Sequence, residues 1–151
     1  MGELTLDAAN RIIAATFSAG RRMGLGRLTV AVLDSGGHLV SLQRQDGSEF
    51  LRAGLAVGKA YGAIGMGQSS RSLHERYQRA PGLFQPLSDM TGGKVVPVPG
   101  GVLIRDDDGA ILGGVGVSGD TASNDEAAAT AGIEAAGLLA DHGQREEWRR
   151  T

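Results

Sequence analysis

Two pairs of β-rich segments, each joined by a short turn of small and acidic residues, constrain the fold of this 151-residue chain more than any other feature. The first pair, residues 28–33 and 38–44, surrounds the sequence Asp-Ser-Gly-Gly, and the second, residues 102–105 and 110–117, surrounds Asp-Asp-Asp-Gly. Turns of this composition accept the backbone angles that tight hairpins need. The sequence therefore predicts two antiparallel β-hairpins.

Helical signals lie before, between and after these hairpins. Thr5 is placed to cap a first helix that ends at Gly24 or Gly26, and the apolar spacing predicts a second helix over residues 50–66. A short third helix is expected to start at Ser70. Because helices do not alternate singly with strands, a parallel sheet is excluded and an α+β fold with helices packed on an antiparallel sheet follows.

The later part of the chain gives two weaker predictions. Residues 81–101 contain all four prolines of the chain and predict an irregular connection. Ser123 and Glu126 have the spacing of a capping box, which predicts an alanine-rich helix from there to about residue 140.

Length and charge limit the classes of function. We expect a single domain with its core over about residues 5–140 and a charged tail over 141–151. The absence of cysteine excludes disulfides, thiolate metal sites and cysteine nucleophiles. A net charge of −2 with interspersed signs argues against nucleic acid as a partner. No apolar run reaches a membrane span and no signal peptide is recognisable, so we expect no membrane contact and a cytoplasmic location.

Gly54, Gly58 and Gly62 are spaced by four and fall on one stripe of the second predicted helix. Three glycines inside a helix cost about 3 kcal/mol relative to alanine, so some surface must come closer than alanine would permit. That surface is either another part of the protein, within the fold or across a subunit contact, or a flat ligand. The three glycines are therefore ligand-binding candidates.

Lys59, Arg44 and Asp46 are the candidate catalytic residues. Lys59 is a cation on an otherwise small-residue helix face, where it either binds a carboxylate or is simply solvated. Arg44 and Asp46 share a face at the end of a strand, as a substrate clamp or as a surface ion pair. Gly116 and Ser118, in a glycine-rich strand end before a helix, are candidates for holding an anion, with a structural turn as the alternative.

The three histidines have no spacing that would let one chain form a metal cage, and no metal site is expected from them. His38 or His74 could still supply an axial nitrogen to a haem iron, and Tyr61 or Tyr77 an oxygen. His38 is also a candidate ligand-binding residue. The alternative is that these histidines are solvent-exposed.

Several linked segments together resemble the GlcG/HbpS-like family, often labelled haem-degrading, which includes a C-terminal domain of some PduO adenosyltransferases. The resemblance spans about residues 5–140 and is carried by residues 32–40, 44–48, 56–60, 100–104, 111–119 and 125–126. It implies a profilin-like fold, an antiparallel sheet of about five strands flanked by helices, assembled as octamers. It also implies binding of haem or a related tetrapyrrole.

Three hypotheses of function follow from the sequence. The first is a small-molecule-binding protein, for haem or a related tetrapyrrole, that acts as a homo-oligomer. The second is a small cofactor-free enzyme that carries out lyase- or isomerase-type acid–base chemistry on a carboxylated metabolite. The third is a module that serves assembly alone.

Overall fold

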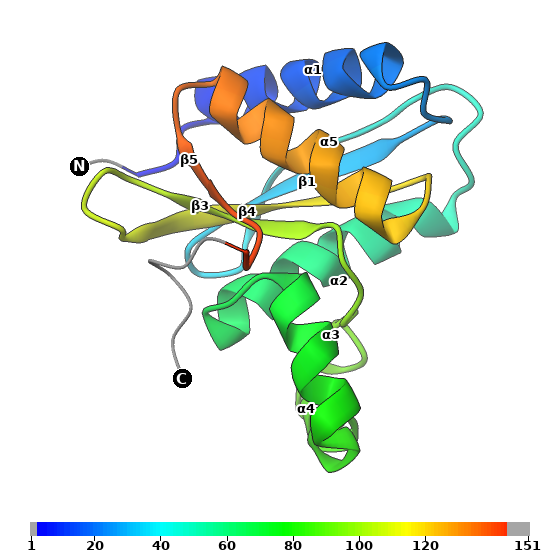
Figure 1. Cartoon of the computed structure of the whole chain (residues 1–151), viewed down its shortest axis with the longest axis vertical. Helices are drawn as coiled ribbons and strands as arrows, with labels where there is room; N and C mark the ends of the chain where they lie inside the picture. The colour runs from blue at the N-terminus through cyan, green and yellow to red at the C-terminus, as the bar shows by residue number, and fades with distance from the viewer. Residues whose placement is uncertain (1–2, 145–151) are drawn as a thin grey trace.

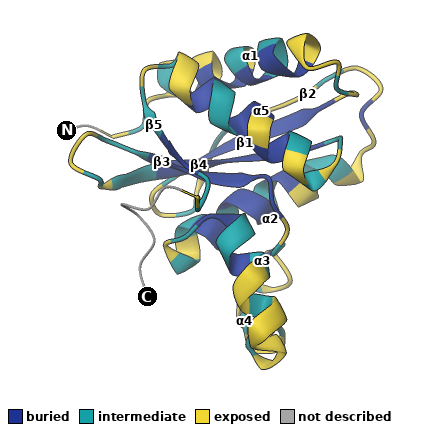
Figure 2. Cartoon of the chain, in the orientation of Figure 1, coloured by how far each residue is buried: buried dark blue, intermediate teal, exposed yellow. Residues whose placement is uncertain are grey.

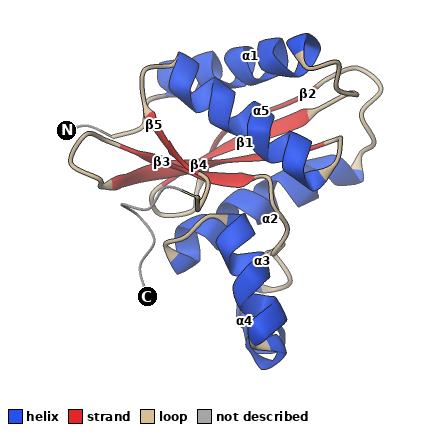
Figure 3. Ribbon diagram, viewed as in Figure 1, coloured by secondary structure: helices blue, strands red, loops and turns tan. Residues whose placement is uncertain are grey.

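The chain folds into an antiparallel five-stranded sheet with helices on both faces (Figure 1, Figure 3), as a computed structural model of residues 3–144 shows. The strand order is β2-β1-β4-β3-β5. The strands are β1 Thr29–Asp34, β2 Leu39–Arg44, β3 Gly101–Arg105, β4 Ile111–Ser118 and β5 Leu139–Asp141. The helices are α1 Leu6–Arg22, α2 Leu51–Met66, α3 Ser70–Arg79, α4 Phe84–Thr91 and α5 Ala122–Ala135, with a 3₁₀ turn η1 Pro81–Leu83.

Both predicted hairpins are present, and they lie side by side in the sheet. Strand β1 pairs with β2 in one hairpin and β3 with β4 in the other. The hairpins join through β1 and β4, in a register that runs from Thr29 opposite Ser118 to Asp34 opposite Gly113. The predicted antiparallel sheet flanked by helices is therefore confirmed.

Helices cover the two faces of the sheet unequally. Helices α1 and α5 lie together on one face and α2 lies on the other, while α3 and α4 extend away from the sheet (Figure 1). Strands β1, β3 and β4 are mostly buried in the middle of the molecule, whereas the edge strand β2 is partly exposed (Figure 2). The larger core, between the sheet and α1 and α5, is built from aliphatic side chains, and its one aromatic neighbour within residues 3–144 is the partly buried Phe17.

Helix α2 approaches the sheet closely because two strand positions facing it are glycines. A Cβ atom on Gly116 would meet the carbonyl group of Ala56, and one on Gly101 would meet the carbonyl group of Lys59. Backbone therefore packs on backbone at both points. The glycines of β3 and β4 thus set the depth at which α2 sits.

The predicted capping box of the last helix is wrong. The N-cap is Thr121, whose hydroxyl accepts a hydrogen bond from the Asn124 backbone N–H at 3.2 Å. Ser123 lies inside the first turn, and Glu126 bonds to Arg71 instead of closing the cap. Because β4 ends at Ser118, the first residue with a capping hydroxyl after the turn is Thr121, and it takes that position.

Two further boundaries differ from the predictions. Helix α5 ends at Ala135, and strand β5 occupies residues 139–141, where the sequence predicts the end of a helix and the start of a tail. Residues 145–151 of that tail lie outside the described residues. The segment predicted to be irregular contains η1 and α4, with Pro86 in the first turn of α4, where its missing N–H leaves no helical bond unmade.

Candidate functional site

A cluster of buried charged groups lies at the end of β4, where α2 and α3 approach α5. Lys59 Nζ donates to the Val117 carbonyl oxygen at 2.8 Å and lies 3.2 Å from Asp125 Oδ2. The side chains of Lys59 and Asp125 are 6% and 1% exposed. Asp125 Oδ1 also accepts from the Asp120 backbone N–H at 2.9 Å. The pair joins the helix on one face of the sheet to a helix on the other.

Gly100 makes this contact sterically feasible. A Cβ atom there would lie 2.9 Å from both Cδ and Nζ of Lys59. The backbone of Gly100 also has φ of 124°, which side chains rarely permit. A glycine at this position is therefore needed for the lysine to reach Asp125.

Two more interactions extend the cluster. Arg71 Nε lies 2.9 and 3.0 Å from the two carboxylate oxygens of Glu126. Arg52 Nη1 donates to the hydroxyl of Ser118 at 3.2 Å. Two cationic side chains from α2 and one from α3 thus face the end of β4 and the start of α5.

Burial shifts the protonation equilibria of the central pair. It raises the pKa of the Asp125 carboxyl and lowers the pKa of the Lys59 ammonium group, because both charged forms lose solvation. Attraction between the two groups opposes these shifts without cancelling them. Such groups are common at reacting centres, but Lys59 and Asp125 line neither of the two surface pockets described for this chain.

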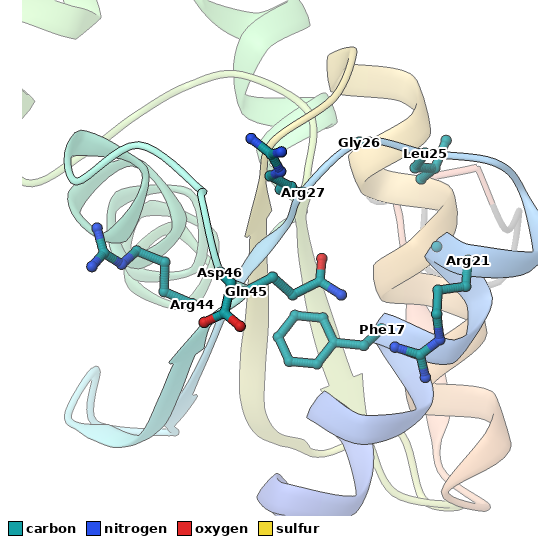
Figure 4. A pocket seen from close by; sticks show the side chains of 9 residues that line it. Phe17, Arg21, Leu25, Gly26, Arg27, Arg44, Gln45 and Asp46 are labelled. Atoms are coloured by element: carbon teal, nitrogen blue, oxygen red, sulfur yellow. The ribbon is translucent and has the colours of Figure 1, made fainter.

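The three candidate catalytic residues do not share one site. Arg44 and Asp46 line a surface pocket of about 720 Å³ between the end of α1 and the end of β2 (Figure 4), and Lys59 is enclosed elsewhere with Asp125. Arg44 donates to the Ser48 carbonyl oxygen at 3.2 Å and forms no ion pair with Asp46 within residues 3–144.

The glycine stripe of α2 is covered by the chain itself at two of its three positions. A Cβ on Gly58 would lie 2.5 Å from the carbonyl oxygen of Lys94 and would also meet Val96. One on Gly62 would lie 2.8 Å from Val95. At these positions the surface that lies against the stripe is the segment before β3. A Cβ on Gly54 would meet nothing within 4 Å.

The other candidate anion-binding residues are engaged within the fold. Gly116 faces the backbone of α2, and Ser118 is buried and bonded to Arg52. At the α5 N-terminus that follows, the Asn124 backbone N–H donates to the Thr121 hydroxyl and the Thr121 backbone N–H donates to Asp120 Oδ1.

His38 lies at the tip of the first hairpin and is paired with a carboxylate. Its Nδ1 lies 3.1 Å from Asp34 Oδ1, and its side chain is 80% exposed. Asp34 Oδ1 also accepts the backbone N–H groups of Gly36 and His38, both at 2.9 Å. These backbone bonds, that from His38 foremost, lower the pKa of the Asp34 carboxyl. The hairpin therefore presents an exposed imidazole whose Nδ1 side is fixed by a carboxylate.

The remaining haem-ligand candidates are less accessible, because each already contacts another group of the protein. His74 is half-buried, with Nδ1 3.0 Å from the Pro97 carbonyl oxygen. The Tyr61 ring lies under the Lys94 ammonium group, 5.5 Å from its centroid. Tyr77 packs edge-on against Phe84 at 5.0 Å. Among the described residues, no group of three or more histidine, aspartate or glutamate side chains is arranged to hold a metal ion.

Sequence reasoning did not single out Asp125, Glu126, Arg52 or Arg71 as parts of one cluster. Lys59 and Asp125 are far apart in the chain and on opposite faces of the sheet, so no spacing rule links them. The available signals were a lysine on a small-residue helix face and the adjacent acidic residues Asp125 and Glu126 near the start of another helix.

A family model described as "Haem degrading protein HbpS-like" matches residues 4–134. Among curated proteins, an uncharacterized 15.0 kDa protein from the dhaT-dhaS intergenic region of Citrobacter freundii is 25% identical over 131 residues, which are 87% of this chain and 90% of that protein. None of the helices within residues 3–144 has the length and hydropathy to cross a bilayer.

Solved structures are similar over nearly the whole chain. A double mutant of HbpS from Streptomyces reticuli is 29% identical with a TM-score of 0.77, covering 89% of this chain and 88% of that one. A PduOC:haem complex is 24% identical with a TM-score of 0.79, covering 91% and 97%. The protein ORFY of Klebsiella pneumoniae is 24% identical with a TM-score of 0.80, covering 92% and 94%. The last two likenesses establish the fold.

Proposed function

Since the chain belongs to the HbpS-like family of haem-degrading proteins, we propose that it binds haem or a related tetrapyrrole, with the imidazole of His38 as the protein ligand to the iron. The observation that carries this proposal is the pairing of His38 with Asp34 on an exposed hairpin tip. The crystallised haem complex of the structurally similar PduOC supports the choice of ligand class.

The Asp34–His38 pair has the arrangement that metal-binding histidines commonly use. A carboxylate acceptor fixes the proton on Nδ1, so the lone pair resides on Nε2, which is the nitrogen free to coordinate. The carboxylate also makes the imidazole a stronger ligand. Asp34 itself is held in place by two backbone N–H groups, so the imidazole is oriented before any ligand arrives.

The other candidates fit this role less well. His74 also has Nδ1 bonded to an oxygen acceptor, but it is half-buried and its acceptor is a neutral carbonyl. The Tyr61 oxygen belongs to a ring already covered on one face by Lys94. His38 is thus the candidate with both exposure and a charged partner.

A large flat ligand on an exposed hairpin needs apolar cover that one chain alone does not provide. Leu39, next to His38, is 55% exposed, while neither described pocket includes His38. We therefore propose that the protein acts as a homo-oligomer and that a second copy covers the ligand, with an octamer as the expected assembly. We expect Phe50 and Leu51, which are 77% and 68% exposed at the start of α2, to contact other copies, because exposed neighbouring apolar side chains favour association.

Titration of the purified protein with hemin tests the proposal. The wild type should show a shifted Soret band, His38→Ala should lose it, and His74→Ala should retain it as a matched control. Asp34→Asn keeps an oxygen acceptor for the turn but removes the charge, and should weaken hemin binding about tenfold. A His38→Ala variant that binds hemin like the wild type would overturn the assignment.

The arrangement of the candidate catalytic residues does not favour the acid–base enzyme hypothesis. That hypothesis requires Lys59 to act together with Arg44 and Asp46 on one substrate, whereas Lys59 is enclosed with Asp125 and the other two line a separate pocket. No specific observation favours that set as a reacting centre.

A further inference from the structure

The pocket between α1 and β2 is lined by an unusual excess of positive charge. Its lining includes Arg21, Arg27 and Arg44 but only one acidic residue, Asp46. Three arginines against one aspartate leave a charge of +2 in a chain whose net charge is −2. The pocket thus differs in sign from the molecule around it, and this local field favours an anion.

These arginines form no close ion pair within residues 3–144, although Glu49 lies near enough to Arg27 to interact with its charge. Arg44 donates one hydrogen bond to a backbone carbonyl oxygen, which leaves most of its donors available. The close ion pair of Glu49 is with Arg52, at 3.0 Å, and its interaction with Arg27 is a longer-range coulombic one.

Gln45 adds an oriented neutral donor. Its Oε1 accepts from the Leu28 backbone N–H at 2.7 Å, and its own backbone N–H donates to the Leu28 carbonyl oxygen at 3.0 Å. The first bond fixes which end of the amide is oxygen, so the Nε2 group is the end left to donate. Figure 4 shows the Gln45 side chain extending toward Phe17.

Phe17 gives the pocket a flat apolar wall. The ring is half-buried and packs against the larger core, so its position is set by the fold. In Figure 4 the Arg21 guanidinium group lies beside Phe17, while Arg27 and Arg44 lie at the rim with their ends directed outward. Long exposed side chains at a rim can turn toward a bound charge at little cost.

Stabilisation of the α1 C-terminus does not explain this charge. Arg21 and Arg22 both lie in the last turn of α1, where cations interact favourably with the helix dipole. That role applies to both residues alike, but only Arg21 lines the pocket. It also does not apply to Arg27 or Arg44, which lie outside the helix.

We propose that this pocket binds a small molecule that carries a carboxylate or phosphate group on a flat apolar body. The arginines and the Gln45 amide would hold the anionic group, and Phe17 would lie against the apolar body. The volume of about 720 Å³ is within the range of small-molecule sites. The pocket contains none of the haem-ligand candidates, so this site is separate from the one proposed above.

Calorimetric titration of the full chain with benzoate, phenyl phosphate and neutral benzamide tests the proposal. Benzoate or phenyl phosphate should bind at least tenfold more tightly than benzamide, because only the anions engage the arginines. Arg21→Ala and Arg44→Ala should each weaken anion binding about five- to tenfold. Asp46→Asn should tighten anion binding, because it removes the negative charge in the pocket that repels the anion.

Arg22→Ala is the matched control, since it removes the same charge from the same helical turn outside the pocket. It should leave anion binding unchanged, and so should His38→Ala, which separates this site from the haem site. Equal affinity for benzoate and benzamide, or equal losses in Arg21→Ala and Arg22→Ala, would overturn the proposal. If benzoate and phenyl phosphate differ, the tighter one identifies the anionic group that the pocket prefers.

Discussion

At the scale of single residues, Lys59 and Asp125 form an ion pair that is almost completely removed from solvent. Both side chains are almost fully buried, and burial acts against the charged form of each. A buried ion pair of this kind adds little net stability, yet removing one partner leaves the other charge without compensation. The pair is therefore better viewed as a specific connection between α2 and α5 than as a source of stability.

Replacing one partner should cost far more than replacing both. Lys59→Met is expected to lower the free energy of unfolding by about 3–5 kcal/mol, because Asp125 stays buried without its counter-charge. In the double variant Lys59→Met/Asp125→Asn, the amide oxygen still accepts from the Asp120 backbone N–H, and most of that loss should be recovered. Urea denaturation followed by circular dichroism measures both, and a single variant as stable as the wild type would contradict the expectation.

Asp120 should make stability depend on acidic pH. Its carboxylate accepts from the Asn124 side chain and from the backbone N–H groups of Gly26 and Thr121, and these bonds lower its pKa below the model-peptide value of 3.8. Since the folded pKa is the lower one, the contribution is present above pH 3.8 and is lost as the pH falls through the folded value. The stability difference between wild type and Asp120→Ala should therefore be constant near pH 6 and shrink below pH 3.8. A difference that is the same at pH 6 and pH 2.5 would show that the charge of Asp120 is irrelevant; thermal unfolding across this range measures it.

At the scale of helices and strands, the sequence predicted features that depend on neighbouring residues in the chain. It did not predict features that depend on contacts with distant segments. The hairpins and α1 follow from turn chemistry, apolar spacing and the Thr5 cap, all of which act within a few residues. The observed cap of α5 differs from the predicted one because several residues that can cap a helix, Thr121 and Ser123 among them, lie close together, and the end of β4 decides which of them takes the position. The glycine stripe of α2 was recognised, but its covering segment comes from residues 94–96, which no spacing rule connects to it.

Two alanine substitutions in α2 separate helix propensity from packing. Gly54→Ala should raise the free energy of unfolding by about 1 kcal/mol, because the added methyl meets nothing and alanine favours the helix. Gly58→Ala adds the same methyl against the Lys94 carbonyl oxygen and should lower it by about 1–3 kcal/mol. Chemical denaturation of the pair provides its own control, since the two changes are identical in kind. Similar effects of the two would mean that the segment before β3 does not lie on α2.

At the scale of the whole molecule, family and sheet architecture were accessible from sequence because they rest on several linked segments. The predicted resemblance is confirmed by the family match over residues 4–134, and the antiparallel sheet with flanking helices is confirmed by the strand pairing. The charged cluster was not accessible, because Arg52, Lys59 and Arg71 meet their partners only after the sheet has brought β4 and α5 beside α2 and α3. The expected cytoplasmic location and octameric assembly stay predictions.

The pairing of β1 with β4 has a consequence for how the chain reaches this structure. Each hairpin closes over a turn of a few residues, an event of about 1–10 μs. Joining the two hairpins must bring Thr29 to Ser118, with α2, α3 and α4 in the intervening chain, and this large loop loses its freedom before the central strands gain any contact. Refolding should therefore be governed by that single long-range encounter, and the hairpins should be in place well before it occurs.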